Sequence, residues 1–170
     1  MDLIELMMVE HVSLRVRLDE LQYRREPDFF IAINQFVLNC HAKVEDEAVF
    51  PRLKAILTGD HELLNTTSKI EADHKLISTL GGNMEKWIKD KDLSLFERRI
   101  EVYSKTVVQH NAMEESLVFP FWGKVSAEKA RSALEEAKRI INQFGQDRYF
   151  EITGVSKHLF NKIWLDETQF

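Results

Sequence analysis

Four long segments of the chain each carry apolar side chains at alternating steps of three and four residues. This spacing places the side chains on one face of a helix, and such a face is buried against other helices. Only six glycines and three prolines interrupt the 170 residues, so the helices can be long. Because the connections are short, the pattern predicts an all-α fold, an antiparallel up-down four-helix bundle.

Caps and helix breakers set the expected limits of these helices. Pro27 separates the first two, because the residue before a proline disfavours helix and the proline itself suits a first turn. The third begins either after Asp60 or at Ser68, and the fourth at Ser94; both serines have a glutamate three residues later, as in a capping box. The four helices are expected at about residues 2–25, 28–57, 60–91 and 94–123.

Composition narrows the classes of function. The length suits one domain, and a net charge of −5 argues against nucleic-acid binding, which depends on clustered Lys and Arg. A single cysteine, Cys40, excludes Cys-rich metal sites and favours a reducing compartment. No apolar run approaches the roughly 20 residues of a membrane span. We therefore expect a cytoplasmic protein that binds neither nucleic acid nor membranes.

A C-terminal extension, residues 124–170, follows the predicted bundle of residues 1–123. Ser126 is expected to cap a fifth helix over residues 127–143. The segment after Gly145 is rich in large apolar side chains, so we expect it to pack on the bundle or on a second copy of the chain, which would make a homo-oligomer. These side chains are Tyr149, Phe150, Ile152, Leu159, Phe160, Ile163 and Trp164.

An internal repeat marks two of the helices. Residues 41–51 read HAKVEDEAVFP and residues 110–120 read HNAMEESLVFP, with five identities in eleven positions. Each block holds a His-x-x-x-Glu pair, and a spacing of four places both side chains on one helix face. The pairs are His41 with Glu45 and His110 with Glu114.

Each of the four apolar stripes contains one histidine. Measured from the hairpin turns at the same end of the bundle, all four lie at roughly 20 to 24 Å, given a rise of 1.5 Å per residue. They should therefore share one layer of the interior. The four histidines are His11, His41, His74 and His110.

Four imidazoles and two carboxylates in a water-poor core would be costly without a partner. A metal ion removes that cost, because this donor set suits iron, zinc or manganese. Six groups are too many for one tetrahedral zinc ion but suit two metals bridged by both carboxylates. The sequence thus predicts a dinuclear metal site.

This pattern resembles the hemerythrin-like, or His-His-Glu cation-binding, family over roughly residues 1–123. The resemblance implies a four-helix bundle with a non-haem di-iron centre, two iron ions joined by an oxo or hydroxo bridge. It also implies that Glu45 and Glu114 bridge the irons. His11 and His41 would serve one iron, and His74 and His110 the other.

The chain departs from the oxygen-carrying members of that family, which have a fifth histidine on the third helix and an aspartate five residues after the last histidine. Here Ser78 and Ile70 lie four residues on either side of His74, and Glu114 stands one residue earlier than the aspartate. Both irons would then keep an open position. Glu71 is the best available substitute for the missing ligand.

Two classes of function fit this site. The first is a protein that binds or senses a small ligand such as dioxygen, nitric oxide or hydrogen peroxide. The alternative is an enzyme, either a di-iron oxidase or peroxidase or one that repairs iron centres. Iron storage or cation handling is disfavoured, because the ferritin-type Glu-x-x-His motif occurs only at Glu71 to His74.

Several further residues have two interpretations. Four acidic residues beside the predicted ligands could orient imidazole N–H groups or could simply be solvated charges. Tyr103, two turns before His110, could contact a bound ligand or be core. Cys40 is interpreted as a small buried apolar residue, His61 and His158 as ordinary residues, and Pro51 and Pro120 as helix kinks. The four acidic residues are Glu10, Asp46, Asp73 and Glu115.

Overall fold

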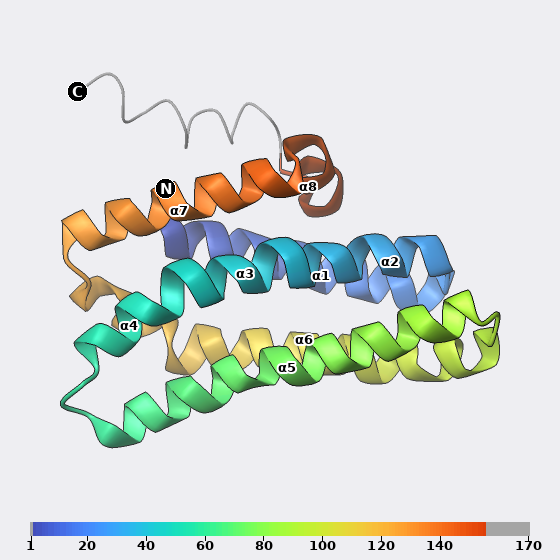
Figure 1. The fold of residues 1–170 in the computed structure, drawn as a ribbon, viewed down its shortest axis with the longest axis horizontal. Helices are drawn as coiled ribbons and strands as arrows, with labels where there is room; N and C mark the ends of the chain where they lie inside the picture. Colours follow the sequence, from blue (N-terminus) through green and yellow to red (C-terminus); the bar gives the residue numbers. More distant parts are fainter. Residues whose placement is uncertain (1, 156–170) are drawn as a thin grey trace.

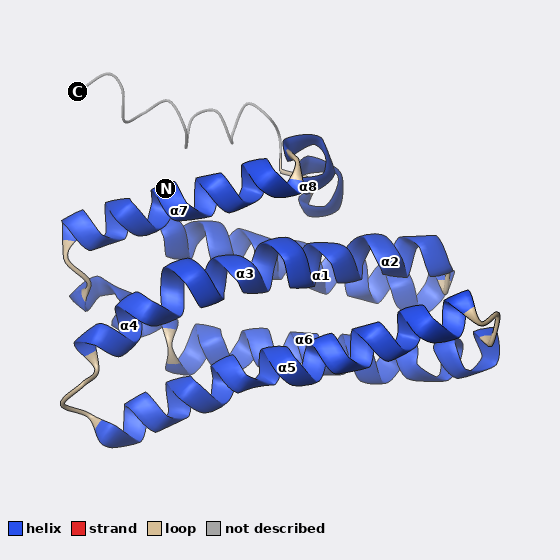
Figure 2. Ribbon diagram, viewed as in Figure 1, coloured by secondary structure: helices blue, strands red, loops and turns tan. Residues whose placement is uncertain are grey.

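The computed structural model describes residues 2–155, and all of its regular secondary structure in that range is helical (Figure 2). Four helical rods form the bundle. The first is α1 (Leu3–Arg24), the third α5 (His61–Lys89) and the fourth α6 (Leu93–Leu117). The second is a composite helix in five consecutive parts: α2 (Pro27–Phe36), η1 (Val37–His41), α3 (Ala42–Val44), η2 (Glu45–Val49) and α4 (Phe50–Ile56).

The rods form a closed ring in which each contacts its two neighbours. The composite helix lies between α1 and α5, and α6 closes the ring between α5 and α1. The turns that close the two hairpins lie at the same end of the bundle (Figure 1). The predicted all-helical bundle with additional C-terminal helices is therefore confirmed.

The caps explain where the helices begin. Asp2 forms a reciprocal capping box with Glu5, and Asp60, not Ser68, caps α5 by accepting from the Leu63 N–H at 3.0 Å. The expected cap at Ser94 is wrong. Asp92 accepts from the Leu95 N–H at 3.2 Å, so α6 starts directly after this cap, at Leu93, which is earlier than expected.

The composite helix was expected to be one continuous α-helix, but two π turns, η1 and η2, interrupt it. Pro51 lies in the first turn of α4, directly after η2, and lacks the N–H that would continue the ladder. The Arg52 side chain donates to two backbone carbonyl oxygens in this region, that of Glu47 at 2.8 Å and that of Ala48 at 3.1 Å. The proline thus accompanies a wider helical turn.

The fourth rod ends earlier than expected. α6 stops at Leu117, and the 3₁₀ segment η3 (Phe119–Lys124) carries Pro120 in its first turn. A proline disfavours the α conformation of the residue before it, which accounts for the end of the α-helix before Phe119. Pro120 therefore separates two elements and does not kink one helix.

The described part of the C-terminal extension packs on the bundle. Ser126 caps α7 (Ala127–Phe144), which lies along α1, α3 and both π turns, and α8 (Gln146–Thr153) contacts α1 and α2 (Figure 1). Gly145, with φ of 105°, allows the sharp turn between the two helices. The predicted residues His158, Leu159, Phe160, Ile163 and Trp164 lie outside the described residues.

The helices pack closely at the end of the bundle near the hairpin turns. A Cβ atom at Gly81 of α5 would lie 2.1 Å from Oδ1 of Asn34 on α2, so only glycine fits there. Within residues 2–155, no helix is both long and apolar enough to cross a membrane.

Candidate metal centre

The six residues of the predicted site come together in the bundle interior, each from its expected rod. His11 lies on α1, His41 closes η1 and Glu45 opens η2. His74 lies on α5, and both His110 and Glu114 lie on α6. We call these six side chains the inner cluster.

The inner cluster divides into two groups that share both carboxylates. His11, His41, Glu45 and Glu114 offer ligand atoms that all lie within 4.8 Å of one another. A second set, Glu45, His74, His110 and Glu114, meets the same limit. Each group is thus compact enough to surround one cation.

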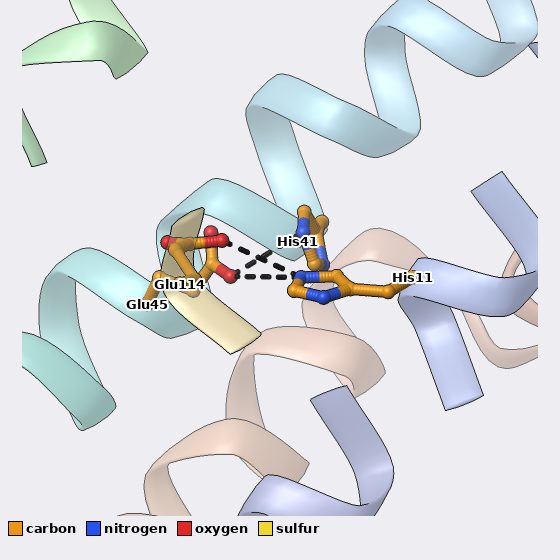
Figure 3. Close-up of side chains that lie close together, drawn as sticks. All are labelled: His11, His41, Glu45 and Glu114. Carbon is orange, nitrogen blue, oxygen red and sulfur yellow. Dashed lines mark ion pairs between the residues drawn. The ribbon is translucent and has the colours of Figure 1, made fainter. Parts of the chain in front are cut away.

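The first group, formed by His11 and His41, uses one oxygen of each carboxylate. His11 Nε2 lies 3.5 Å from Glu45 Oε1 and 3.5 Å from Glu114 Oε2. His41 Nε2 lies 3.3 Å from the same Glu45 Oε1. Figure 3 shows the two carboxylates side by side, facing the two imidazoles.

The second group uses the opposite oxygens. His74 Nε2 lies 3.2 Å from Glu45 Oε2, and His110 Nε2 lies 3.3 Å from Glu114 Oε1. The two Nε2 atoms themselves are 2.9 Å apart. Each glutamate therefore directs one oxygen to each histidine pair, which is the arrangement of a carboxylate that bridges two ions.

The donor atoms of the cluster fit a metal better than they fit one another. Both carboxylates are completely buried, and none of their four oxygens has a hydrogen-bond partner. The Nε2 atoms of His11 and His41 are also buried without a partner. Buried polar atoms are rarely left unpaired, and cations bound between these groups would satisfy them all.

The charges of the cluster are strongly coupled. Burial alone would lower the pKa of His11, but the carboxylates of Glu114 and Glu45 raise it to about 10. Burial also opposes a charged His74, whose pKa is nevertheless raised to about 10 by Asp46 and Glu45. Although burial opposes its ionisation, Glu45 has a pKa well below the usual range because of His41, His11 and His74. Without metal, the protonated imidazoles of His11 and His74 therefore balance the charge of the ionised Glu45 carboxylate.

Outer carboxylates contact the histidines on the side away from the cluster. His41 Nδ1 lies 2.8 Å from Glu10 Oε2, His11 Nδ1 lies 2.9 Å from Glu115 Oε1, and His74 Nδ1 lies 2.8 Å from Asp46 Oδ1. A proton on Nδ1, donated to these oxygens, leaves Nε2 free for a metal. The contacts that an orienting role requires are therefore present at three histidines. The fourth pair, His110 Nδ1 and Asp73 Oδ2, is longer, at 3.9 Å.

These outer contacts run around the bundle in one direction. α1 supplies Glu10 to the composite helix, which supplies Asp46 to α5. In turn α5 presents Asp73 to α6, and α6 supplies Glu115 to α1. Each acceptor is the sequence neighbour of an inner-cluster residue, so the packing that assembles the ligands also assembles their supports.

A small cavity borders the second group. Its volume is about 10 Å³, which accommodates about one water-sized molecule. His41, Glu45, His74 and His110 line it together with the amide of Asn111, which is completely buried and has neither polar atom hydrogen-bonded. The apolar lining comprises Val37, Leu38, Ala42, Ile77 and Val107.

Other candidate residues lie away from the cluster. The expectation that Glu71 replaces the missing ligand is not met, because its carboxylate forms an ion pair with Lys54 and belongs to neither group. Tyr103 is core, and its hydroxyl donates to Asn34 Oδ1 at 3.0 Å. His61 is exposed at the start of α5. Cys40 is buried, and burial raises the pKa of its thiol.

Sequence reasoning missed two features of the site. The π turns η1 and η2 bracket the segment between His41 and Glu45, and such turns are frequent at functional sites. Tyr149 of α8 donates to Glu10 Oε1 at 2.8 Å. The sequence signalled only that this segment must pack on something.

Comparison with known proteins adds one match. A model of the family described as the hemerythrin HHE cation binding domain matches residues 2–122. The match covers the four rods and most of η3 and stops before α7. No curated protein and no solved structure matched the chain.

Proposed function

The chain belongs to the hemerythrin HHE cation-binding family, and from that premise we propose that it holds two iron ions and binds a small ligand at them. The ligands would be dioxygen, nitric oxide or hydrogen peroxide. The observation that carries this proposal is the sharing of Glu45 and Glu114 between two buried groups of ligand atoms.

The sharing supports two ions in preference to one. Each carboxylate presents Oε1 and Oε2 to different histidine pairs, so one ion would leave half of the buried donors unpaired. In this assignment His11 and His41 bind one ion, and His74 and His110 bind the other. Imidazole with carboxylate donors suits iron, which when bound would supply redox chemistry and open coordination positions.

The number of donors supports ligand binding. Two imidazoles and two carboxylate oxygens would hold each iron, and this set would leave coordination positions open for a small ligand. The missing ligand is not replaced by Glu71, which is paired with Lys54.

The small size of the cavity supports a ligand that is itself very small. It has room for about one water-sized molecule. The buried amide of Asn111 can hydrogen-bond a ligand there, while the apolar lining excludes bulk water.

The metal assignment is tested by stoichiometry. Glu45→Ala or Glu114→Ala should lose most of both metals, because each carboxylate serves both ions, whereas His74→Ala should lose mainly one. His61→Ala is the matched control, since His61 is exposed and outside the cluster. Elemental analysis of the purified proteins gives the result. Equal metal retention in all four variants would contradict the assignment.

The ligand assignment is tested with the reduced, iron-loaded protein. A charge-transfer band that appears with oxygen or nitric oxide and disappears when the gas is removed supports reversible binding. Rapid irreversible oxidation or consumption of peroxide would instead favour the oxidase or peroxidase alternative. A spectrum with one six-coordinate iron bound by three protein nitrogens would reject the open position.

A further inference from the structure

One hydrogen-bond chain connects the C-terminal extension to the metal centre. The Tyr149 hydroxyl donates to Glu10 Oε1 at 2.8 Å, and Glu10 Oε2 lies 2.8 Å from His41 Nδ1. Tyr149 and Glu10 are both completely buried, and His41 is 2 % exposed. The chain therefore runs through the protein interior, from α8 to the first histidine pair.

Glu10 differs in its surroundings from the other outer carboxylates. The side chains of Glu115, Asp73 and Asp46 are 22 %, 36 % and 46 % exposed, so water can reach them. Glu10 has no exposed surface, so the protein must supply the donors to its two oxygens. Tyr149 supplies one and His41 the other. Removal of the phenol would leave a buried carboxylate oxygen without this donor, at a free-energy cost that Glu10 can relieve only by moving.

The structure also holds the tyrosine in place. Ser13 donates to the Thr153 carbonyl at 2.7 Å, and Arg17 donates to the carbonyls of Ile152 and Glu151, both at 2.9 Å. These carbonyls lie in the last turn of α8, where no helical partner is available. Glu10, Ser13 and Arg17 follow steps of three and four, so one face of α1 both anchors α8 and carries Glu10.

We propose that Tyr149 is a positioning residue of the metal centre. Its hydroxyl fixes the Glu10 carboxylate, which in turn fixes the ring orientation and tautomer of His41. In this way α8, outside the family match of residues 2–122, completes the half of the centre formed by His11 and His41. The inference rests on the proposed binding of two metals, because it predicts an effect on one of them.

Burial keeps the phenol in the donating form. It raises the pKa of Tyr149 well above its ordinary value, and the charge of Glu10 adds to the effect. The tyrosine therefore stays protonated over the pH range in which metals bind. Its contribution is that of a hydrogen-bond donor and not of a metal ligand.

The test is stepwise zinc binding by the full, metal-free chain in competition with a chelator. Tyr149→Phe should weaken one of the two zinc affinities about tenfold and leave the other within about twofold, since loss of a group that orients a ligand typically costs 10- to 100-fold. Cobalt(II) then serves as a spectroscopic probe. The visible absorption of one cobalt should change in Tyr149→Phe.

Tyr103→Phe is the matched control. Tyr103 is also a completely buried tyrosine that donates one hydrogen bond to a side chain, but its acceptor, Asn34, is outside the inner cluster. It should lose stability without a change in either zinc affinity. If Tyr149→Phe behaves in the same way, Tyr149 is only a packing residue and the proposal is wrong. An equal loss at both metals would overturn it too, because that result indicates general loosening of the bundle.

A double-mutant cycle tests whether Tyr149 acts through Glu10. Glu10→Gln should weaken the same zinc step, and adding Tyr149→Phe should weaken it no further. If Tyr149→Phe does not fold, Arg17→Gln removes two anchors of α8 and should weaken the same step by a smaller factor; no change would count against the proposal. If the wild-type chain binds only one zinc ion, the proposed dinuclear function fails first, which is a separate result.

Discussion

Two adjacent glycines of α5 should respond in opposite ways to the same substitution. Both lie inside the helix, where Gly→Ala stabilises by about 1 kcal/mol through helix propensity. A Cβ at Gly82 meets no atom within 4 Å, so Gly82→Ala should realise that gain. A Cβ at Gly81 would lie 2.1 Å from Asn34 Oδ1, which must then move.

The free-energy cost of Gly81→Ala follows from the hydrogen bonds that the Asn34 side chain makes. Its amide donates to Glu85 Oε1 at 2.7 Å, and its oxygen accepts from the Tyr103 hydroxyl at 3.0 Å. Loss of these bonds costs about 1 to 2 kcal/mol each, because the Tyr103 hydroxyl is completely buried and Glu85 is an ionisable acceptor. After the helix gain is subtracted, Gly81→Ala should destabilise by about 2 kcal/mol, so the two variants should differ by about 3 kcal/mol.

Urea unfolding of the metal-free proteins measures this difference. Metal must be absent, because a ligand bound to the folded state adds its own stabilisation. The midpoint should rise for Gly82→Ala and fall for Gly81→Ala, with little change in slope. If both midpoints rise, Asn34 reorients at no cost, and the close approach of α5 to α2 does not constrain the sequence.

Three further predictions follow from the outer carboxylates, the helix caps and the cluster charges. Asp46→Asn should weaken binding of one metal about tenfold, because Asp46 lies 2.8 Å from the His74 ring. Asp73→Asn should weaken it much less, because Asp73 lies 3.9 Å from the His110 ring. Equal effects in a chelator competition would contradict this prediction. Asp92→Ala should lower the free energy of unfolding by about 1 kcal/mol, because Asp92 caps α6. Ser94→Ala should lower it by less than about 0.5 kcal/mol. The reverse order in urea unfolding would show that Ser94 is the cap. Because His11 and His74 have pKa values raised to about 10, their contribution to the stability of the metal-free fold is complete below about pH 6.5 and lost as the pH rises towards 10. Metal uptake near pH 7 should displace these protons, which calorimetry in buffers of different ionisation enthalpy detects; uptake without proton release would show that both imidazoles are already neutral.

The two halves of the metal centre are inequivalent. His11 is completely buried and His41 nearly so, whereas the side chain of His74 is 10 % exposed. The first half is supported by Glu10 with Tyr149 and by Glu115, which also accepts from Arg15 at 2.8 Å. The second half has Asp46 at 2.8 Å from His74 and the more distant Asp73, and both carboxylates are partly exposed. Exogenous ligands and metal exchange should therefore favour the second half.

Local rules predicted the bundle well, because a helix cap or an apolar stripe depends on residues within a few positions. The limits of α1 and α7 agree with expectation to within one residue. Errors occurred where two local signals competed, as at Asp92 and Ser94, and where packing overrode the α-helix, as in η1 and η2. A π turn adds one residue to a helical turn, and a stripe whose steps already vary between three and four residues can absorb that residue, so the stripe alone did not reveal η1 or η2.

The amino-acid sequence alone determined that His41 shares a helix face with Glu45 and His110 with Glu114, because four residues are about one helical turn. It also determined, through equal distances from two turns, that four histidines occupy one layer. Only the tertiary structure decided which oxygen of each glutamate faces which histidine, since that depends on the rotation of each helix against its neighbours. It alone brought Tyr149 to Glu10 across 139 residues, because no local spacing encodes a contact between helices so far apart in the chain.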